Sequence, residues 1–188
     1  MTIIMNQIKD VQPIRSKKEI DDMKWSLKRW CSERDYILFF IGINTGLRCG
    51  DILKLKTADI LRMNKRELKI KEGKTAKVRT IDFNNIYDEV KAYAQTVNSE
   101  WLFPSRKGEE PITVTQAYRQ LNKSADMVGL ESVGTHTMRK TFGYHYYSRT
   151  KNIAMLQTIL NHSTPAITLK YIGYNDKEIS DSLKDFYL

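Results

Sequence analysis

Two short segments in the middle of the chain interrupt an otherwise helical pattern of apolar residues. Glu67-Leu-Lys-Ile-Lys71 alternates apolar and polar residues, and Lys77-Val-Arg-Thr-Ile81 does so more loosely. A period of two is typical of half-buried strands, and the short EGKTA stretch between the segments suits a β-hairpin. Apolar spacing on both sides of the pair is helical. The pattern therefore predicts a mainly α-helical domain with one small antiparallel β-sheet, an α+β fold.

Capping residues and apolar spacing locate the predicted helices. Ser16 and Glu19 form an S-x-x-E capping box, and Thr113 and Gln116 form a second box, so a helix should begin at each. The apolar run YILFFIGI predicts a largely buried helix. The predicted helices cover about residues 16–30, 33–44, 49–55, 86–97, 113–129, 136–148, 152–160, 165–172 and 176–188. A polar lead, residues 1–15, precedes one domain, residues 16–188.

Several classes of protein are disfavoured by simple features of the chain. No apolar run approaches the ~18 residues that a membrane span requires, and the N-terminus lacks the basic and apolar regions of a signal peptide. We therefore expect a cytoplasmic protein with no membrane partner. Cys31 and Cys49 belong to no CxxC pair and no histidine cluster, which argues against a disulfide or zinc framework.

The charge balance points toward a polyanion. Thirty-one Lys and Arg residues against 22 Asp and Glu residues give a net charge of +9 and a pI near 9.4. Nucleic acid is the commonest partner of a basic protein of this size. A basic surface that serves only solubility has the same composition, so charge alone leaves both explanations open.

Two arginines and a histidine are candidates for binding a phosphate. Arg48 follows a helix-breaking glycine in TGLRCGDI, where a new helix can present its guanidinium to an anion. His136 and Arg139 are one helical turn apart and can converge on a ligand, which a phosphate suits because arginine grips two oxygens and histidine transfers protons. Ordinary surface positions on a turn and a helix are the simpler explanation of each motif alone.

A histidine and a tyrosine flank the start of another predicted helix. Thr164 or Ser163 can cap this helix and Pro165 suits its first turn, which leaves His162 just before the helix and Tyr171 two turns inside it. The chain has ten tyrosines, and most tyrosines on short helices are packing residues. Packing is therefore the simpler explanation of Tyr171 by itself.

The predicted hairpin is basic. It carries Lys71, Lys74, Lys77 and Arg79. These side chains could make non-specific contacts with DNA phosphates. Alternatively, they could simply be exposed to solvent and have no binding role. A lysine at the tip could instead reach into an active site as a general acid.

Taken in chain order, these residues resemble the catalytic set of the tyrosine recombinases, the phage integrase family. The segments that carry the likeness are TGLRCGDILKL, EGKTAKVRTI, THTMRKTFGYH and LNHSTPAITLKYIGY. The matching catalytic residues are Arg48, Lys74, His136, Arg139, His162 and Tyr171. Six functional residues occur in the family's order. The simpler explanations given above for each residue alone do not account for this joint match. The resemblance implies the tyrosine recombinase catalytic-domain fold and site-specific recombination of double-stranded DNA.

The resemblance also implies which residues break and hold the strand. Tyr171 would be the nucleophile, forming a 3′-phosphotyrosyl link and releasing a 5′-hydroxyl. Arg48 and Arg139 would clamp the non-bridging oxygens of the scissile phosphate. Because a free tyrosine has a pKa of about 10, its phenolate needs such positive neighbours at neutral pH.

Other roles follow from the same resemblance. Lys74 would protonate the leaving oxygen, although Lys77 lies three residues on and is a second candidate. His136 would act in proton transfer around the tyrosine, and His162 would hydrogen-bond the phosphate. Asp51 would support the active site. Each step exchanges one phosphodiester-like bond for another, and the motifs contain neither a P-loop nor a carboxylate cluster, so no metal, ATP or other cofactor is expected.

The match with the family is incomplete at the start of the chain, while the end of the chain resembles a family element. Most members carry an N-terminal core-binding domain that clamps DNA, and here only about 15 residues precede the first predicted helix. The last predicted helix has apolar spacing at Ile179, Leu183 and Phe186. In the family such a helix docks on a neighbouring subunit and ties the active sites into a tetramer. Packing of this helix onto its own domain is equally compatible with the sequence.

Other functions share some of these features. The same chemistry serves a type IB topoisomerase, although the residues around the motifs resemble that family less. A catalytically idle DNA-binding regulator could retain the fold, although the intact catalytic set argues against it. An RNA-binding helical domain would be expected to carry clustered exposed aromatic residues for stacking on bases, which the sequence lacks.

Overall fold

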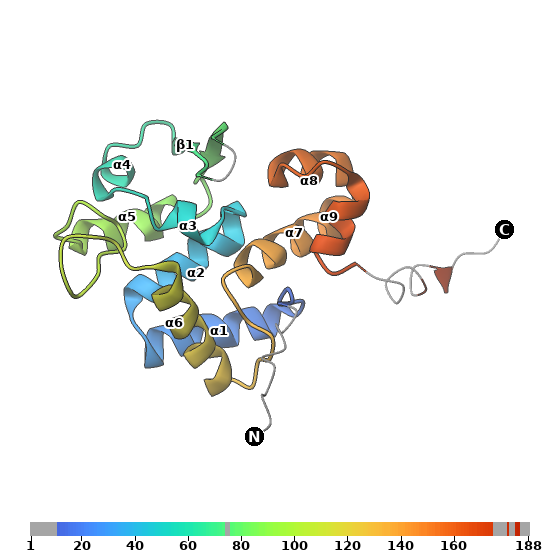
Figure 1. Ribbon diagram of the computed structural model, residues 1–188, viewed down its shortest axis with the longest axis horizontal. Helices are drawn as coiled ribbons and strands as arrows, with labels where there is room; N and C mark the ends of the chain where they lie inside the picture. Colours follow the sequence, from blue (N-terminus) through green and yellow to red (C-terminus); the bar gives the residue numbers. More distant parts are fainter. Residues whose placement is uncertain (1–10, 74–75, 175–179, 181–182, 185–188) are drawn as a thin grey trace, which may run out of the picture.

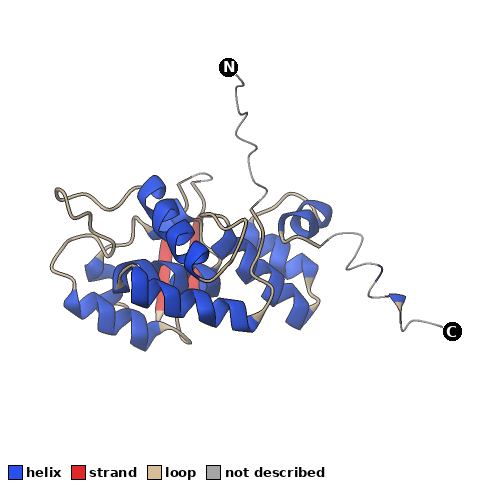
Figure 2. Ribbon diagram, turned by 90° about the horizontal axis from the view of Figure 1, so that it is seen from below, coloured by secondary structure: helices blue, strands red, loops and turns tan. Residues whose placement is uncertain are grey.

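The computed structural model describes residues 11–73, 76–174, 180, 183 and 184. Within these residues the chain is mostly helical, and two strands form a small antiparallel sheet (Figures 1 and 2). The elements are α1 (Lys17–Trp30), α2 (Glu33–Thr45), α3 (Cys49–Ile52), α4 (Thr57–Leu61), β1 (Glu67–Lys71), β2 (Val78–Asp82), α5 (Tyr87–Thr96), α6 (Val114–Met127), α7 (Thr137–Thr150), α8 (Ile153–Leu160) and α9 (Pro165–Tyr171). The predicted α+β class is confirmed.

Helix α2 is the centre of the hydrophobic core. It packs against α1, α3, α5, α6 and α7, and its Ile37, Phe39 and Ile41 side chains are fully buried. This burial agrees with the apolar run that predicted the helix. Figure 1 shows the hairpin at the top, above α3, and α8 and α9 to its right, with α7 leading toward them. Among the described residues, no helix is long and apolar enough to cross a bilayer.

Both predicted capping boxes are present. The Ser16 hydroxyl accepts a hydrogen bond from the Glu19 amide at the start of α1, and the Glu19 carboxylate accepts one from the Ser16 amide. Thr113 and Gln116 make the same reciprocal pair at the start of α6. These boxes satisfy amide groups that have no partner within the helix.

The structure differs from the sequence prediction around α3. A helix was predicted over residues 49–55, but α3 ends at Ile52, and the unpredicted helix α4 begins at Thr57. The chain between them hydrogen-bonds to a distant segment: the Thr57 amide donates to the Glu100 carbonyl at 2.9 Å, and the Leu102 amide donates to the Leu55 carbonyl at 2.9 Å. These long-range backbone contacts replace the helical ones, and local spacing does not reveal them.

Smaller differences occur at other element ends. Strand β2 spans Val78–Asp82, one residue later than predicted, and Ile70 lies opposite Arg79 in the register. His136 is the N-cap of α7 and not its first residue. Most of the helix predicted over residues 176–188 lies outside the described residues, including Ile179 and Phe186.

The residues before α1 pack along α7. The Lys140 ammonium donates to the Val11 carbonyl at 2.6 Å, and the Ile14 amide donates to the Thr141 hydroxyl at 2.9 Å. Arg15 donates from Nη2 to the Gly173 carbonyl at 3.0 Å, two residues beyond the end of α9. Residues 11–15 therefore connect α7 with the segment that follows Tyr171.

Gly143 allows α7 to pass close to the residue after Tyr171. A Cβ atom at this position would lie 2.6 Å from Cγ2 of the fully buried Ile172. We expect Gly143→Ala to lower the free energy of unfolding by about 1–3 kcal/mol, because overpacking forces neighbouring groups to shift. Urea unfolding measures this change.

Gly50→Ala is the matched control for this prediction. Gly50 also lies in a helix, and its added Cβ would meet Cγ2 of Val114 at an ordinary 3.8 Å. Its stability should stay the same or rise slightly, since alanine favours helix over glycine. Equal stabilities of the two variants would contradict the close packing at Gly143.

Candidate active site

The turn after α2 is built from the TGLR motif. The Thr45 hydroxyl donates to the Ile41 carbonyl at 2.8 Å and accepts from the Leu47 amide at 3.3 Å. Gly46 has φ of 64°, and a Cβ there would overlap the ring of Phe142. Glycine is therefore required for both backbone conformation and space. Leu47 is fully buried and anchors the turn in the core.

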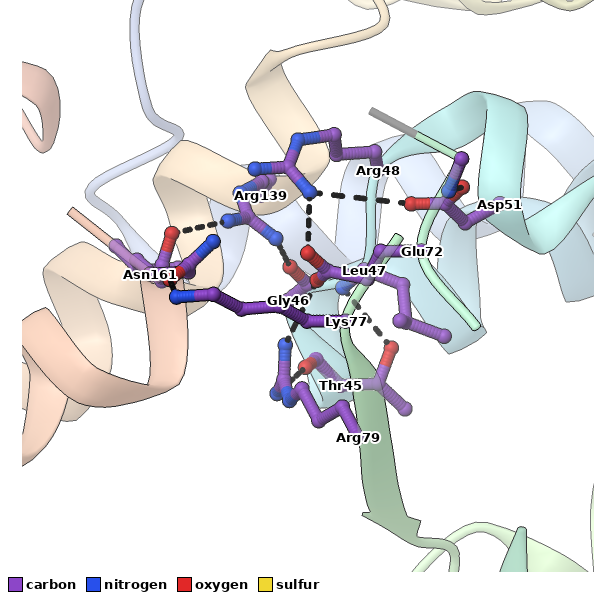
Figure 3. A network of polar contacts seen from close by, with 12 residues as sticks. Thr45, Gly46, Leu47, Arg48, Asp51, Glu72, Lys77, Arg79, Arg139 and Asn161 are labelled. Atoms are coloured by element: carbon purple, nitrogen blue, oxygen red, sulfur yellow. Dashed lines mark hydrogen bonds and ion pairs between the residues drawn. The ribbon is translucent and has the colours of Figure 1, made fainter. Parts of the chain in front are cut away.

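Two arginines donate to the carbonyls that this turn exposes. Arg139, from α7, donates from Nη1 to the Gly46 carbonyl and from Nη2 to the Leu160 carbonyl at 2.7 Å. Arg79, from β2, donates from Nη2 to the Thr45 carbonyl at 3.0 Å. Burial lowers the pKa of both guanidinium groups, yet arginine remains charged at neutral pH. The turn therefore holds two positive groups on its backbone (Figure 3).

Arg48, the third arginine, is held by carboxylates. Its Nη1 donates to Oε2 of Glu72 at 2.7 Å and lies 4.0 Å from Oδ2 of Asp51. Oδ1 of Asp51 also accepts from the Gly73 amide at 2.9 Å. Asp51 therefore connects α3 with the residues that follow β1, and its role in supporting the reaction remains a prediction.

Tyr171 is the last residue of α9, as far from the helix start as predicted. The Thr164 hydroxyl caps this helix by accepting from the Ile167 amide at 3.2 Å, and Pro165 occupies the first turn. The Tyr171 phenol oxygen lies 3.3 Å from Nδ1 of His136. The ring of His162 meets the Tyr171 ring edge to face, with centroids 4.8 Å apart. His136, 35 residues before Tyr171 in the sequence, and the nearby His162 thus both lie against one phenol.

Electrostatic effects on the Tyr171 phenol oppose one another. Burial raises its pKa above the usual 10, while the charges of Arg139 and Arg48 and a hydrogen bond from Arg139 lower it. Burial has the larger effect, so the pKa is raised overall. The phenol is therefore protonated at neutral pH, and an attack by its oxygen requires a group that accepts the proton.

The hydrogen bonds of His162 define its tautomer. Its Nδ1 lies 3.2 Å from the Thr168 hydroxyl, which itself donates to the Thr164 carbonyl at 3.1 Å. Because that hydroxyl has one hydrogen, Nδ1 of His162 is the donor, and Nε2 carries the lone pair of the neutral ring. Burial, and then the charges of Arg139 and Arg48, lower the pKa of His162.

The lowered pKa of His162 predicts a loss of stability in acid. An unfolded histidine titrates near 6.5, so the unfolded chain binds this proton more tightly than the folded chain does. The contribution of neutral His162 to the free energy of unfolding is fully present above about pH 6.5 and is lost as the pH falls below this value. We expect the urea-unfolding free energy to fall more for the wild type than for His162→Gln between pH 7.5 and 5.0. An identical fall in both proteins would contradict the lowered pKa of folded His162.

The roles predicted for the hairpin lysines remain predictions. Lys74 lies outside the described residues, and the choice between Lys74 and Lys77 as general acid remains open. The Lys77 ammonium donates to Oδ1 of Asn161 at 2.8 Å, so this side of the hairpin reaches the residue before His162. Lys71 is exposed. Contact of Lys71 and Lys77 with DNA remains a prediction.

Arg79 is directed toward the protein and is only partly exposed, so it does not face solvent as a basic hairpin residue commonly would. It points toward the Thr45 carbonyl, and its Nη1 lies 3.9 Å from Oε1 of Glu72. Direct contact of Arg79 with DNA likewise remains a prediction.

Glu72 was not singled out from the sequence, although a signal existed. Leu68, Ile70 and Glu72 occupy alternate positions, and alternate residues of a strand share one face. Leu68 and Ile70 pack with the core, so the alternation carries Glu72 inward as well. The Glu72 carboxylate lies against Arg48 with only 2% of its side chain exposed.

Space for a ligand adjoins these groups. A cavity of about 390 Å³ opens beside Arg48 and His136, with Lys54, Gly73 and Val114 among its other lining residues. In the part of the chain that the structure describes, no group of three His, Cys, Asp or Glu side chains could hold a metal ion. The arrangement combines a phenol, two imidazoles and guanidinium groups, which suits attack on a phosphate.

Integrases and recombinases are among the known proteins whose sequences resemble this chain. The chain is 46% identical over 178 residues to the "Probable integrase/recombinase YoeC" of Bacillus subtilis, covering 94% of this chain and 97% of that protein. It is 28% identical to the "Tyrosine recombinase XerA" of Pyrococcus furiosus, covering 80% of this chain and 54% of that protein. The chain thus spans almost all of one relative and about half of the other.

Solved structures share the fold. A XerH site-specific recombinase in a post-cleavage complex with difH substrate superimposes with a TM-score of 0.71 at 21% identity, over 94% of this chain and 54% of that one. A lambda integrase tetramer bound to a Holliday junction superimposes with a TM-score of 0.71 at 14% identity, over 93% of this chain and 51% of that one. The sequence profile of the phage integrase family matches residues 16–178. The chain therefore belongs to the phage integrase family, as the catalytic motifs predicted.

Proposed function

We propose that this protein cuts and rejoins double-stranded DNA at specific sites through a covalent link between Tyr171 and a backbone phosphate. The observation that carries the proposal is the gathering of His136, His162 and Arg139 around a single phenol. Membership of the phage integrase family and the similarity to integrases and recombinases support the same reaction. The XerH recombinase, which shares the fold, has been solved on its DNA substrate after cleavage.

In the first step the Tyr171 oxygen forms a bond to phosphorus while the bond from phosphorus to the 5′ oxygen breaks. The phenol proton passes to a neighbouring base, and Nδ1 of His136, 3.3 Å from the phenol oxygen, is suited to accept it. The 5′ oxygen takes a proton from a hairpin lysine, Lys74 or Lys77, and leaves as a hydroxyl. The DNA keeps its 3′ phosphate as a phosphotyrosine ester.

Positive charge stabilises the transition state of this step. Arg48 and Arg139 are proposed to bind the non-bridging phosphate oxygens, where charge concentrates during phosphoryl transfer. His162 adds a hydrogen bond to the phosphate when its Nε2 carries a proton. Rejoining is the reverse reaction, with a 5′-hydroxyl of a new strand attacking the phosphotyrosine ester. Since the phosphotyrosine bond replaces the broken phosphodiester bond and is later exchanged for a new one, the cycle consumes no ATP.

Assembly on DNA is part of the proposal. A lambda integrase of similar fold has been solved as a tetramer on a Holliday junction. We propose that this chain also acts as a homo-oligomer on DNA, with its C-terminal segment as the connecting element.

A nicked suicide duplex tests the proposed reaction. A nick a short distance 3′ of the cleavage point lets the small fragment with the new 5′-hydroxyl diffuse away, so the covalent complex accumulates. We expect a DNA adduct that survives denaturation, that forms in the presence of EDTA, and whose released strand has a 5′-hydroxyl that a polynucleotide kinase labels directly. DNA from the natural neighbourhood of the gene provides candidate sites. Tight binding to such a site without any adduct would overturn the proposal and favour a regulator that only binds DNA.

A further inference from the structure

We propose that Glu72 is a positioning residue for strand cleavage: it fixes the Arg48 guanidinium and the lysine-bearing turn of the hairpin in one arrangement. This inference rests on the function proposed above. Glu72 follows β1 and takes no part in the chemical steps. Its carboxylate lies between two arginines from different elements, Arg48 before α3 and Arg79 in β2 (Figure 3).

The contact with Arg48 is short and protected from water. Oε2 of Glu72 accepts from Nη1 of Arg48 at 2.7 Å, and the Glu72 side chain is only 2% exposed. A charge-assisted hydrogen bond of this length orients a guanidinium more firmly than a neutral contact does. An arginine side chain otherwise has many rotamers, so this bond restricts where the phosphate-binding nitrogens of Arg48 can point.

The carboxylate is on the buried side of Arg48, and Glu72 does not line the cavity that opens beside this arginine. The Arg48 side chain is 20% exposed, whereas Glu72 is 2% exposed. The cavity beside Arg48 is lined by Arg48 and His136 but not by Glu72. An incoming phosphate can therefore reach Arg48 while the Glu72 contact is kept. This geometry favours a positioning role over one in which Glu72 blocks the site until DNA arrives.

Glu72 also supplies negative charge to a crowded positive cluster. The charges of Arg48 and Arg79 each disfavour the protonated form of Arg139, and the charge of Glu72 favours it. The Oε1 atom of Glu72 lies 3.9 Å from Nη1 of Arg79. Without this carboxylate the three guanidinium groups would repel one another more strongly. Arg79 and Arg139 are also bound to backbone carbonyls, so Arg48 is the group most able to move away.

The backbone of Glu72 closes the turn of the hairpin. Its amide donates to the Lys77 carbonyl at 2.9 Å, and its carbonyl accepts from the Ala76 amide at 2.8 Å. The residue that orients Arg48 is thus hydrogen-bonded through its backbone to Ala76 and Lys77 of the turn. One residue therefore couples the position of Arg48, through its side chain, to that of Lys77, through its backbone.

Three substitutions test the proposal on the full chain with the nicked duplex. Glu72→Gln removes the charge and keeps the shape, and Glu72→Asp keeps the charge on a shorter side chain. Glu67→Gln is the matched control, because Glu67 is an exposed carboxylate in β1, the strand that Glu72 follows. The measurements are the adduct-forming rate at saturating DNA, the Kd for the same DNA, and the thermal unfolding midpoint.

We expect Glu72→Gln to slow adduct formation roughly 10- to 100-fold, because glutamine offers only a neutral acceptor and turns an amide NH2 group toward one of the two arginines. Its Kd for DNA should be unchanged or tighter, because a negative charge has been removed. Glu72→Asp should recover part of the rate, and Glu67→Gln should match the wild type. A Glu72→Gln rate equal to or above that of the wild type overturns the proposal, and a faster rate would favour a blocking role.

An independent readout separates failure of this inference from failure of the proposed function. Arginine side-chain NMR reports how firmly each guanidinium is held, without any DNA. The Arg48 signal should become mobile in Glu72→Gln, while Arg34, held by Asp35 at 2.8 Å, should not change. An unchanged Arg48 signal overturns the positioning role whether or not the wild type cleaves. A wild type that forms no adduct counts against the proposed function alone.

Discussion

Tyr171→Phe is expected to reduce adduct formation on a nicked duplex to below detection, more than about a thousandfold. The substitution removes only the phenol oxygen, and with it the atom that would form the bond to phosphorus. The ring remains and can keep its edge-to-face contact with His162, so the fold and non-covalent DNA binding should persist. The rate is measured on denaturing gels and the affinity by DNA retardation.

Tyr174→Phe is the matched control for this result. Tyr174 lies three residues further along the chain, and its hydroxyl is 3.4 Å from Oγ of Ser148. It packs against the rings of Tyr144 and Tyr147, away from the arginine cluster. This variant should form adduct at close to the wild-type rate. Equal adduct from Tyr171→Phe and the wild type would show that another residue is the nucleophile.

Arg139 substitutions are expected to have the second largest effect, on both reaction and stability. Arg139 is 2% exposed and donates to the carbonyls of Gly46 and Leu160. Arg139→Ala leaves both carbonyls without this donor, and each buried unsatisfied group costs about 1–3 kcal/mol. We therefore expect the unfolding free energy to fall by about 2–5 kcal/mol, as measured in urea.

Arg139→Lys distinguishes the chemical role from the structural one. Lysine keeps the positive charge but lacks the planar fork that reaches two carbonyls and a phosphate together. Its adduct-forming rate should fall by roughly 10²- to 10³-fold, the usual effect of removing one donor that stabilises transition-state charge. Arg149→Ala, an exposed arginine of the same helix, should leave rate and stability near the wild type. A rate for Arg139→Lys within a few-fold of the wild type would exclude a bidentate role.

Sequence was most informative where structure depends on local chemistry. Both capping boxes depend on side chains three residues apart, and the sequence contains them directly. The Gly46 turn and the capped helix of Tyr171 are local features of the same kind. The hairpin followed from alternation. The grouping of the catalytic residues, in contrast, came from the family resemblance, since no local rule brings His136 and Tyr171 together.

Features that depend on long-range packing were missed. The short α3 and the unpredicted α4 reflect backbone contacts with residues about 45 positions away, as between Thr57 and Glu100. The inward direction of Arg79 depends on the Thr45 carbonyl from another element. Glu72 shows an intermediate case: alternation predicts that it faces inward, but only the fold reveals that Arg48 is its partner.

Mass spectrometry of the covalent complex tests the central claim most directly. After adduct formation on the nicked duplex, nuclease digestion leaves a short nucleotide on the protein, and trypsin releases the peptide YIGYNDK, residues 171–177. This peptide contains Tyr171 and Tyr174, which fragmentation distinguishes. We predict a 3′-linked nucleotide phosphate on Tyr171 alone. A nucleotide on Tyr174 or on any other residue would contradict the account.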